Sequence, residues 1–385
     1  MVLDKVNIYR IVLPFSIEFS HSLRKRFSAK NIIVEVIANH GEIKGYGEGA
    51  PRSYVTGESQ ESAAKSVSQI LQNSKFPWQM NDVSQVSNFI ESITSGKEKN
   101  AAICALEIAL LDVLGRYQKK SIIDYFREDF YADTICYGAT IPLANSQQIM
   151  EICQWIKEIQ VNNLRLKIGK DFEQNKAAIK AVKLIFGDNY DLRIDTNGAW
   201  DLELALAHIP LIEEYNVKVI EQPLIPEDPD LVEFAGMIRD HGVILMADES
   251  ACSLEDVEGI IKEKNYSMIN VRLSKCGGFQ NSFRIIDQLR TNGLSFQIGC
   301  QLGESGILSA AGRALGLLCK DAMYYDGSYD IFMLKDNITT EHVSFGPGGK
   351  AGPLDGSGLG VKINKESLMR LSKGYPNLSI SNPLS

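Results

Sequence analysis

The chain has 385 residues, of which 44% are hydrophobic and 23% charged, with a formal net charge of −8 and a pI near 5.3. This length favours one large α/β domain accompanied by a smaller one. The acidic balance, without a basic stripe, argues against a nucleic-acid or anionic-membrane partner. A small anionic substrate remains compatible, because a metal and local lysines can dominate one cleft.

Seven cysteines are scattered along the chain without C-x-x-C spacing, which predicts reduced thiols rather than disulfides or a zinc site. The first residues, MVLDKVNIYR, contain no apolar signal-peptide core. The most apolar helical segment, 101–114, is interrupted by Glu107 and Asp112, so no membrane span is predicted. We therefore expect a cytoplasmic protein, and we expect it to form a homo-oligomer.

The first part of the chain is typical of an α+β domain. Segments 4–14 and 30–38 alternate apolar and polar residues as strands do, and a turn at Asn39-His40-Gly41 leads into a third strand at 42–48. Apolar residues at helical spacing follow in segments 58–73, 81–95 and 98–118.

From about residue 135, short apolar runs that end in polar residues alternate with helical patterns. The runs are ICYGATIP, LRLKIG, DLRIDTNGAW, VKVIEQPL, VILMADES, MINVRLSKCGG, LSFQIGC and MYYDGS. Such alternation implies parallel strands joined by right-handed crossovers, and eight strands close a barrel. A solenoid is the alternative, but the repeats share no side-chain consensus. No clear helix follows the eighth run, and we expect the Gly- and Pro-rich tail 341–360 to return to the first domain.

Polar residues end these runs, at the edge where barrels of this kind form their active sites. Arg165 and Lys167 end the second run, and Lys275 ends the sixth. Acids end the three runs in between, and further polar residues follow at other ends: Asp195, Asn197, Glu221, Asp248, Glu249, Gln301, Glu304 and Asp326.

The three acids Asp195, Glu221 and Asp248 would repel one another at one point unless a cation lay between them. Oxygen ligands favour Mg²⁺, or Mn²⁺, over zinc. Such a metal could bind a substrate carboxylate and stabilise the charge of an enediolate. Each acid alone is better explained as a loop residue or a helix cap, but three acids at matching strand ends make that explanation the weaker one.

Lys167 and Arg165 are two residues apart on one strand, so both point into the barrel. A neighbouring guanidinium and metal would lower the pKa of the lysine towards that of a base working near neutral pH. Lys275 lies roughly across the barrel. The two lysines could serve as base and conjugate acid, or one could act while the other neutralises charge; a lone strand-end lysine is usually a surface residue. No histidine is placed to act as a base, and no Ser-His-Asp or Cys-His arrangement favours acyl transfer.

The motifs LRLKIG, RIDTNGAW, VIEQPL, MADES and NVRLSKCGG, with GYGEGAP and NAAICALEIALLDVLG, resemble the muconate cycloisomerase (muconate lactonizing enzyme) subgroup of the enolase superfamily. The resemblance covers most of the chain. It implies an α/β fold, a modified TIM barrel (β/α)7β with an α+β capping domain. The implied parts are the capping domain at 1–125, the barrel at 126–330 and a segment returning to the capping domain at 331–385.

The resemblance also implies site roles. Enzymes of this superfamily use Lys or His bases with Mg²⁺, and the matching positions are the acid/base lysines Lys167 and Lys275. The implied metal ligands are Asp195, Glu221 and Asp248, with Asn197 and Glu249 near the metal.

Three departures from the family pattern bear on the substrate. The usual K-x-K reads Arg165-Leu166-Lys167, which keeps the charge but alters the geometry around the base. The usual N-Q-G-W reads Asn197-Gly198-Ala199-Trp200. Dipeptide epimerases resemble one another in an Asp-x-Asp that holds the substrate ammonium, and here only Asp326 of Asp326-Gly327-Ser328 is kept.

Loops of the capping domain, within 16–27 and 52–58, are expected to select the substrate. Phe19 and Tyr54 could line an apolar pocket, and Arg24 could attract an anionic group, although a short basic run is usually a solvated face. The leading hypothesis is a racemase or epimerase of a dipeptide or N-substituted amino acid that transfers a proton between the two lysines. The alternatives are a lactonizing cycloisomerase or an o-succinylbenzoate synthase-like lyase with one essential lysine, and a non-enzymatic barrel without metal affinity.

Overall fold

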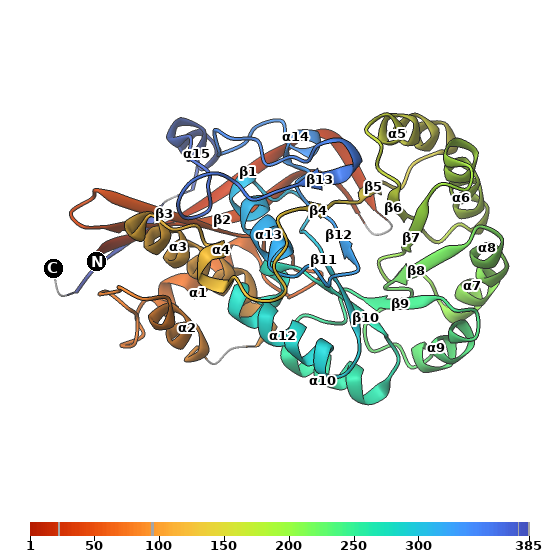
Figure 1. Cartoon of the computed structure of the whole chain (residues 1–385), viewed down its shortest axis with the longest axis horizontal. Coiled ribbons are helices and arrows are strands. Elements are labelled where there is room, and N and C mark those ends of the chain that lie inside the picture. The colour runs from red at the N-terminus through yellow and green to blue at the C-terminus, as the bar shows by residue number, and fades with distance from the viewer. Residues whose placement is uncertain (22–23, 94–95, 376, 384–385) are drawn as a thin grey trace.

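The structure is a computed structural model that describes residues 1–21, 24–93, 96–375 and 377–383, and the side chains of these residues except those of 17–26 and 331. Figure 1 shows an antiparallel sheet with its helices beside a larger α/β unit, with both termini on the side of the antiparallel sheet. The antiparallel sheet has the order β14-β1-β2-β3. Its strands are β1 (Leu3–His21), β2 (Arg24–Ala38), β3 (Ile43–Gly49) and β14 (Leu378–Ser381).

The three predicted N-terminal strands are confirmed, but β1 and β2 form a longer hairpin than the sequence indicated. Their pairing continues past an irregularity between Pro14 and Phe19 and reaches His21 opposite Arg24. This stretch lacks the regular alternation of apolar and polar residues that marks 4–14 and 30–38, so the sequence alone did not predict its pairing.

Helices α1 (Gln60–Ile70) and α3 (Asn100–Gln118) pack on this sheet, and α2 (Val83–Glu91) packs on α3. Ser59 and Asp82 cap the first two through reciprocal capping boxes. Helix α3 packs against β3, where the backbones approach so closely that a Cβ on Gly47 would lie 2.0 Å from the carbonyl oxygen of Ala105. This close approach explains why glycine recurs along β3.

The larger unit is an eight-stranded parallel sheet in which consecutive strands are neighbours. Each predicted run contains one strand of this sheet: β5 (Ala139–Ile141), β6 (Asn163–Lys167), β7 (Asp191–Asp195), β8 (Val217–Glu221), β9 (Ile244–Ala247), β10 (Met268–Val271), β11 (Ser295–Ile298) and β12 (Tyr324–Tyr325). The first and last strands approach each other, since the amide of Gly138 donates to the carbonyl of Tyr325 at 2.8 Å.

Helices connect successive strands of the parallel sheet, and Figure 1 shows several of them on its outer side. They are α5 (Ser146–Glu158), α6 (Phe172–Phe186), α7 (Leu202–Ala207), α8 (Ile209–Glu214), α9 (Leu231–Arg239), α10 (Leu254–Glu263), α11 (Leu273–Cys276), α12 (Phe279–Thr291) and α13 (Gly306–Leu317). Among the residues that the structure describes, no helix is long and apolar enough to cross a membrane.

After β12 the chain forms only short elements: α14 (Asp330–Met333), β13 (Lys350–Ala351) and α15 (Lys365–Leu371). Strand β13 pairs with β4 (Ile135–Cys136), which follows the short α4 (Ile123–Phe126), and β14 pairs with β1. The tail also contacts α3, because the buried carboxylate of Asp112 accepts the amide of Leu359 at 2.8 Å. The last strand of the tail, β14, thereby extends the antiparallel sheet.

Candidate active site

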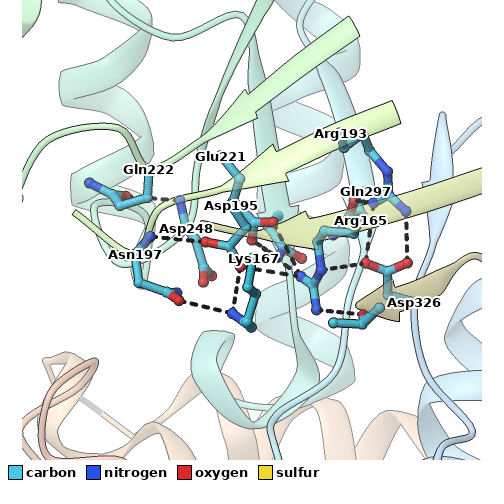
Figure 2. Close-up of polar contacts among 12 residues, drawn as sticks. Arg165, Lys167, Arg193, Asp195, Asn197, Glu221, Gln222, Asp248, Gln297 and Asp326 are labelled. Carbon is cyan, nitrogen blue, oxygen red and sulfur yellow. Dashed lines mark hydrogen bonds and ion pairs between the residues drawn. The ribbon is translucent and has the colours of Figure 1, made fainter. Parts of the chain in front are cut away.

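The predicted acids lie together at one edge of the parallel sheet, as shown in Figure 2. The pairing register places Lys167 beside Asp195, Asp195 beside Glu221, and Glu221 beside Met246 of the next strand. Asp248 follows β9 at the same edge. The three acids are 0% exposed. Parallel strands with matched register therefore bring the predicted ligands to one buried row.

Lys167 and Asp195 form an ion pair, with 2.7 Å between Nζ and Oδ2. The same amine donates to Asn197 Oδ1 at 2.9 Å, and the amide of Asn197 donates to Glu249 at 3.2 Å. The second carboxylate oxygen of Glu249 is buried without a hydrogen-bond partner. The four residues form a continuous polar chain from β6 to the loop after β9.

Glu221 is the most heavily bound of the acids. Arg165 Nη1 and Arg272 Nη2 each lie 3.2 Å from one of its oxygens, and the amide of Asn270 donates to it at 2.7 Å. Burial alone would raise the pKa of Glu221, but the charges of the two arginines outweigh burial and lower it to about 2. Glu221 is therefore ionised throughout the neutral range.

Lys275 lies on α11 and its amine is directed at Asp248. Nζ donates to Oδ1 of that residue at 3.1 Å, to its carbonyl at 2.8 Å, and to the carbonyl of Asn270. Burial alone would lower the pKa of Lys275, but the Asp248 carboxylate more than offsets burial and raises it. The side chain is 0% exposed, and the predicted second lysine is therefore enclosed by the wall of the site.

Arg272, which sequence reasoning missed, lies between two of the acids. It forms ion pairs with Glu221 and Asp248. Within the described part of the chain, no three Asp, Glu, His or Cys side chains are arranged so that they could hold a metal ion. Each of the three predicted carboxylates instead forms an ion pair with a lysine or arginine side chain. The donor chemistry itself, buried carboxylate oxygens from adjacent strands, is the type that Mg²⁺ prefers.

Gln222, also missed, holds the loop that carries Asp248. Its side-chain oxygen accepts the amides of Asp248 and Ser250, each at 3.1 Å, while its side-chain nitrogen donates to the carbonyl of Leu224 at 2.8 Å. A buried amide that bridges two strand ends fixes the position of the acid.

A second buried network surrounds Asp326. Arg193 donates to its two oxygens at 2.9 and 3.1 Å and also contacts Gln297, and Arg165 Nε lies 3.2 Å from Oδ2. Burial would raise the pKa of Asp326, but the two guanidinium charges outweigh burial and lower it. Arg193 precedes Asp195 by two residues, so the two-residue period of β7 could have revealed it as an inward-facing residue.

The remaining predicted residues are also engaged. Ser328 accepts a hydrogen bond from Arg313 at 2.8 Å, at a residue whose φ is +57°. The backbone N–H of Gln301 donates to the Glu304 carboxylate at 2.6 Å. Burial raises the pKa of Glu304 to about 8. Ser328, which occupies the position of the second acid in the Asp-x-Asp pattern, therefore supplies a hydroxyl and not a carboxylate beside Asp326.

A cavity of about 360 Å³ opens beside these groups. Its polar lining includes Arg165, Lys167, Asn197, Glu249 and Arg272, and the predicted Tyr54, Gln301, Glu304 and Ser328 also line it. Lys275 and Asp326 are not among the described lining residues. The side chains of the predicted Phe19 and Arg24 lie outside the described residues.

Acids and amines lie side by side at the strand ends of a parallel α/β fold, which is where enzymes of this architecture place their active sites. Residues 149–367 match the family model described as "Enolase C-terminal domain-like", and the chain belongs to this family. It is an isomerase of the enolase superfamily, similar to the group that contains muconate lactonizing enzyme.

Three known proteins illustrate the likeness. The hydrophobic dipeptide epimerase of Enterococcus faecalis is 26% identical over 81% of this chain and 86% of its own. The N-succinyl-L-Arg/Lys racemase of Bacillus cereus is 24% identical over 97% of this chain and 98% of its own, and its crystal structure superimposes with a TM-score of 0.86 over 99% of this chain and 100% of the other. The muconate lactonizing enzyme of Pseudomonas fluorescens gives a TM-score of 0.83 at 20% identity, covering 96% and 99%.

Proposed function

We propose that this isomerase removes the proton α to a substrate carboxylate and thereby racemises or epimerises an N-substituted amino acid or a dipeptide. The observation that carries the proposal is Lys167, whose amine borders the cavity between Asp195 and Asn197. An amine at the edge of a cavity lined by two arginines suits a base that works on an anionic substrate. The names of the Enterococcus faecalis and Bacillus cereus relatives support the racemase or epimerase outcome.

The proposed cofactor is Mg²⁺, held by Asp195, Glu221 and Asp248. The oxygen donors support this assignment, and a solved structure of the Enterococcus faecalis epimerase is described as complexed with Mg and the dipeptide L-Leu-L-Tyr. Bound Mg²⁺ would supply positive charge where the negative charge of the deprotonated substrate develops. We also propose that the parallel sheet is the modified (β/α)7β barrel of residues 126–330, capped by 1–125 and the returning segment 331–385.

The protein's own residues orient the substrate in this proposal. Arg165 and Arg272 line the cavity, where their guanidinium groups could donate hydrogen bonds to a substrate carboxylate. Lys167 must release its proton before it accepts one from carbon. Asn197, bonded to that amine, holds it in position.

The state of Asp326 favours an N-acylated amino acid over a dipeptide with a free ammonium group. Arg193 and Arg165 already pair with its carboxylate, and Ser328 replaces the second acid and accepts from Arg313. An ammonium group would have to compete with two guanidinium groups for one buried carboxylate. An amide nitrogen needs no such counter-charge.

The position of Lys275 favours a second candidate, a one-base reaction such as cycloisomerisation or elimination. Its amine is saturated by Asp248 and Asn270. A racemase needs a second acid/base group on the opposite face of the substrate, whereas an elimination depends chiefly on one lysine for proton abstraction.

The experiment that separates these functions is α-deuteration in D₂O with MgCl₂, using N-acylamino acids and dipeptides of both configurations. For a two-base racemase, Lys167→Ala should abolish exchange from one enantiomer and Lys275→Ala exchange from the other. For a one-base reaction, Lys275→Ala should retain proton abstraction. Lys218→Ala, an exposed lysine on β8, is the matched control and should behave as wild type. Absence of metal-dependent α-deuteration across the whole set would overturn the proposal.

A further inference from the structure

One face of helix α5 borders the cavity instead of packing wholly against the sheet. Ile152, Trp155, Ile156 and Ile159 all line the cavity, and their spacing of three, four and seven residues places them on one side of the helix. Trp155 is 42% exposed, so part of its indole remains uncovered. A tryptophan left open on a cavity wall is costly unless something covers it.

A second apolar surface completes this side of the cavity. Phe332 and Met333 come from α14, and Phe345 comes from the tail. The Trp155 and Phe332 rings meet edge to face with centroids 5.0 Å apart, and the Phe332 and Phe345 centroids are 5.8 Å apart. We call the set the apolar wall, defined as Ile152, Trp155, Ile159, Phe332, Met333 and Phe345.

Charge and apolar surface are segregated within the cavity. Arg165, Lys167 and Arg272 border one part together with the acids Glu249 and Glu304, and the apolar wall supplies the other. The volume of about 360 Å³ lies within the range of small-molecule sites. A ligand that fills it would therefore meet charged groups at one end and apolar side chains at the other, and a carboxylate at the charged end could accept hydrogen bonds from Arg165 and Arg272.

Resting on the proposed function, we propose that the substrate is an amino acid derivative carrying a large aromatic or branched aliphatic group, which is seated on the apolar wall. The carboxylate lies towards Arg165 and Arg272, and the α-carbon lies between the two parts. A small group would leave the wall in contact with water. A charged group would lose its hydration without gaining a partner from the six wall side chains.

The test uses two substrate series, so that it identifies which substituent meets the wall. N-acetyl-alanine, N-acetyl-aspartate, N-acetyl-leucine and N-acetyl-phenylalanine vary the α side chain, and phenylacetyl-alanine varies the acyl group. We expect kcat/KM for α-deuteration to rise by about tenfold or more from N-acetyl-alanine to the apolar member of one series. N-acetyl-aspartate should be the poorest substrate.

Wall variants test whether that preference comes from the named residues. Phe332→Ala and Trp155→Ala should reduce the preference by about tenfold, and Phe332→Leu should restore most of it. Met237→Ala, an exposed apolar residue on α9, is the matched control and should leave the preference unchanged. Equal loss for all substrates, or an unaltered preference, would overturn the inference.

Calorimetric binding of N-acetyl-phenylalanine and N-acetyl-aspartate distinguishes the two proposals. If nothing is deuterated, yet the phenylalanine derivative binds more tightly and Phe332→Ala removes the difference, the proposed reaction fails and the apolar site stands. If both bind equally, or neither binds, the apolar site is overturned even where deuteration occurs. Circular dichroism of each variant checks that it is folded.

Discussion

Replacing Asp326 by Asn would test whether the buried network beside the candidate site holds the sheet together. The change keeps the size of the side chain but removes its charge. Asp326 and Arg193 are both 0% exposed, with nitrogen–oxygen distances of 2.9 and 3.1 Å, and Arg165 adds a third contact at 3.2 Å. The substitution leaves two buried guanidinium groups short of one negative charge, and it turns amide hydrogens towards them.

The expected cost follows from burial. Breaking a buried ion pair by removing one partner costs about 3–5 kcal/mol, because the remaining charge is left uncompensated. The chain offers a matched exposed pair, Arg290 with Asp321, in which two nitrogens donate to two oxygens at 2.9 and 2.8 Å. An exposed pair contributes about 0–1 kcal/mol. Asp326→Asn should therefore cost at least about 2 kcal/mol more than Asp321→Asn.

Urea unfolding of wild type and both variants measures the difference, with fluorescence and circular dichroism compared to establish that the transition is two-state. Because the arginine charges hold the pKa of Asp326 below its ordinary 3.8, the stability that it contributes is present at neutral pH and is lost as pH falls through that lowered pKa. Equal unfolding midpoints for the two variants at pH 7 would refute the reasoning.

Two further predictions concern buried acids. Asp195→Asn should abolish calorimetric Mg²⁺ binding, and Mg²⁺ at a hundred times its Kd should stabilise wild type but not this variant by about 2.7 kcal/mol; equal stabilisation of both would contradict the proposed ligand set. Burial raises the pKa of Glu107 from 4.5 to about 8, so the stability of the folded chain falls as pH rises across that window. Glu107→Gln should remove a slope of up to about 1.4 kcal/mol per pH unit, measured by urea midpoints at pH 5 and 8; parallel slopes would contradict it.

Local sequence patterns were sufficient to predict the strands of the parallel sheet and the polar residues at their carboxyl ends. The alternation of apolar runs with helical segments located the eight parallel strands, because strands buried on both faces are continuously apolar. Matching register then placed Lys167, Asp195 and Glu221 in one row. The period of apolar residues is a local property, so the sequence by itself determined where the strands lie.

The ion pairs between residues that are far apart in the chain could not be predicted from the sequence. Whether Lys275 faces the substrate or Asp248, and which acids Arg272 bridges, depends on contacts between different strands. Arg193 and Asp326 are 133 residues apart, and neither residue type indicates the other. Partner choice among several buried charges is a competition that only the packed arrangement settles.

The sequence determined that acids and amines share one edge of a parallel sheet, because strand order and residue period follow from local composition. Only the tertiary structure decided how those charges pair and what covers them. The apolar wall shows this most clearly, since α5, α14 and Phe345 belong to separate stretches of chain. A cavity is the space left between such stretches, and no local pattern encodes that space.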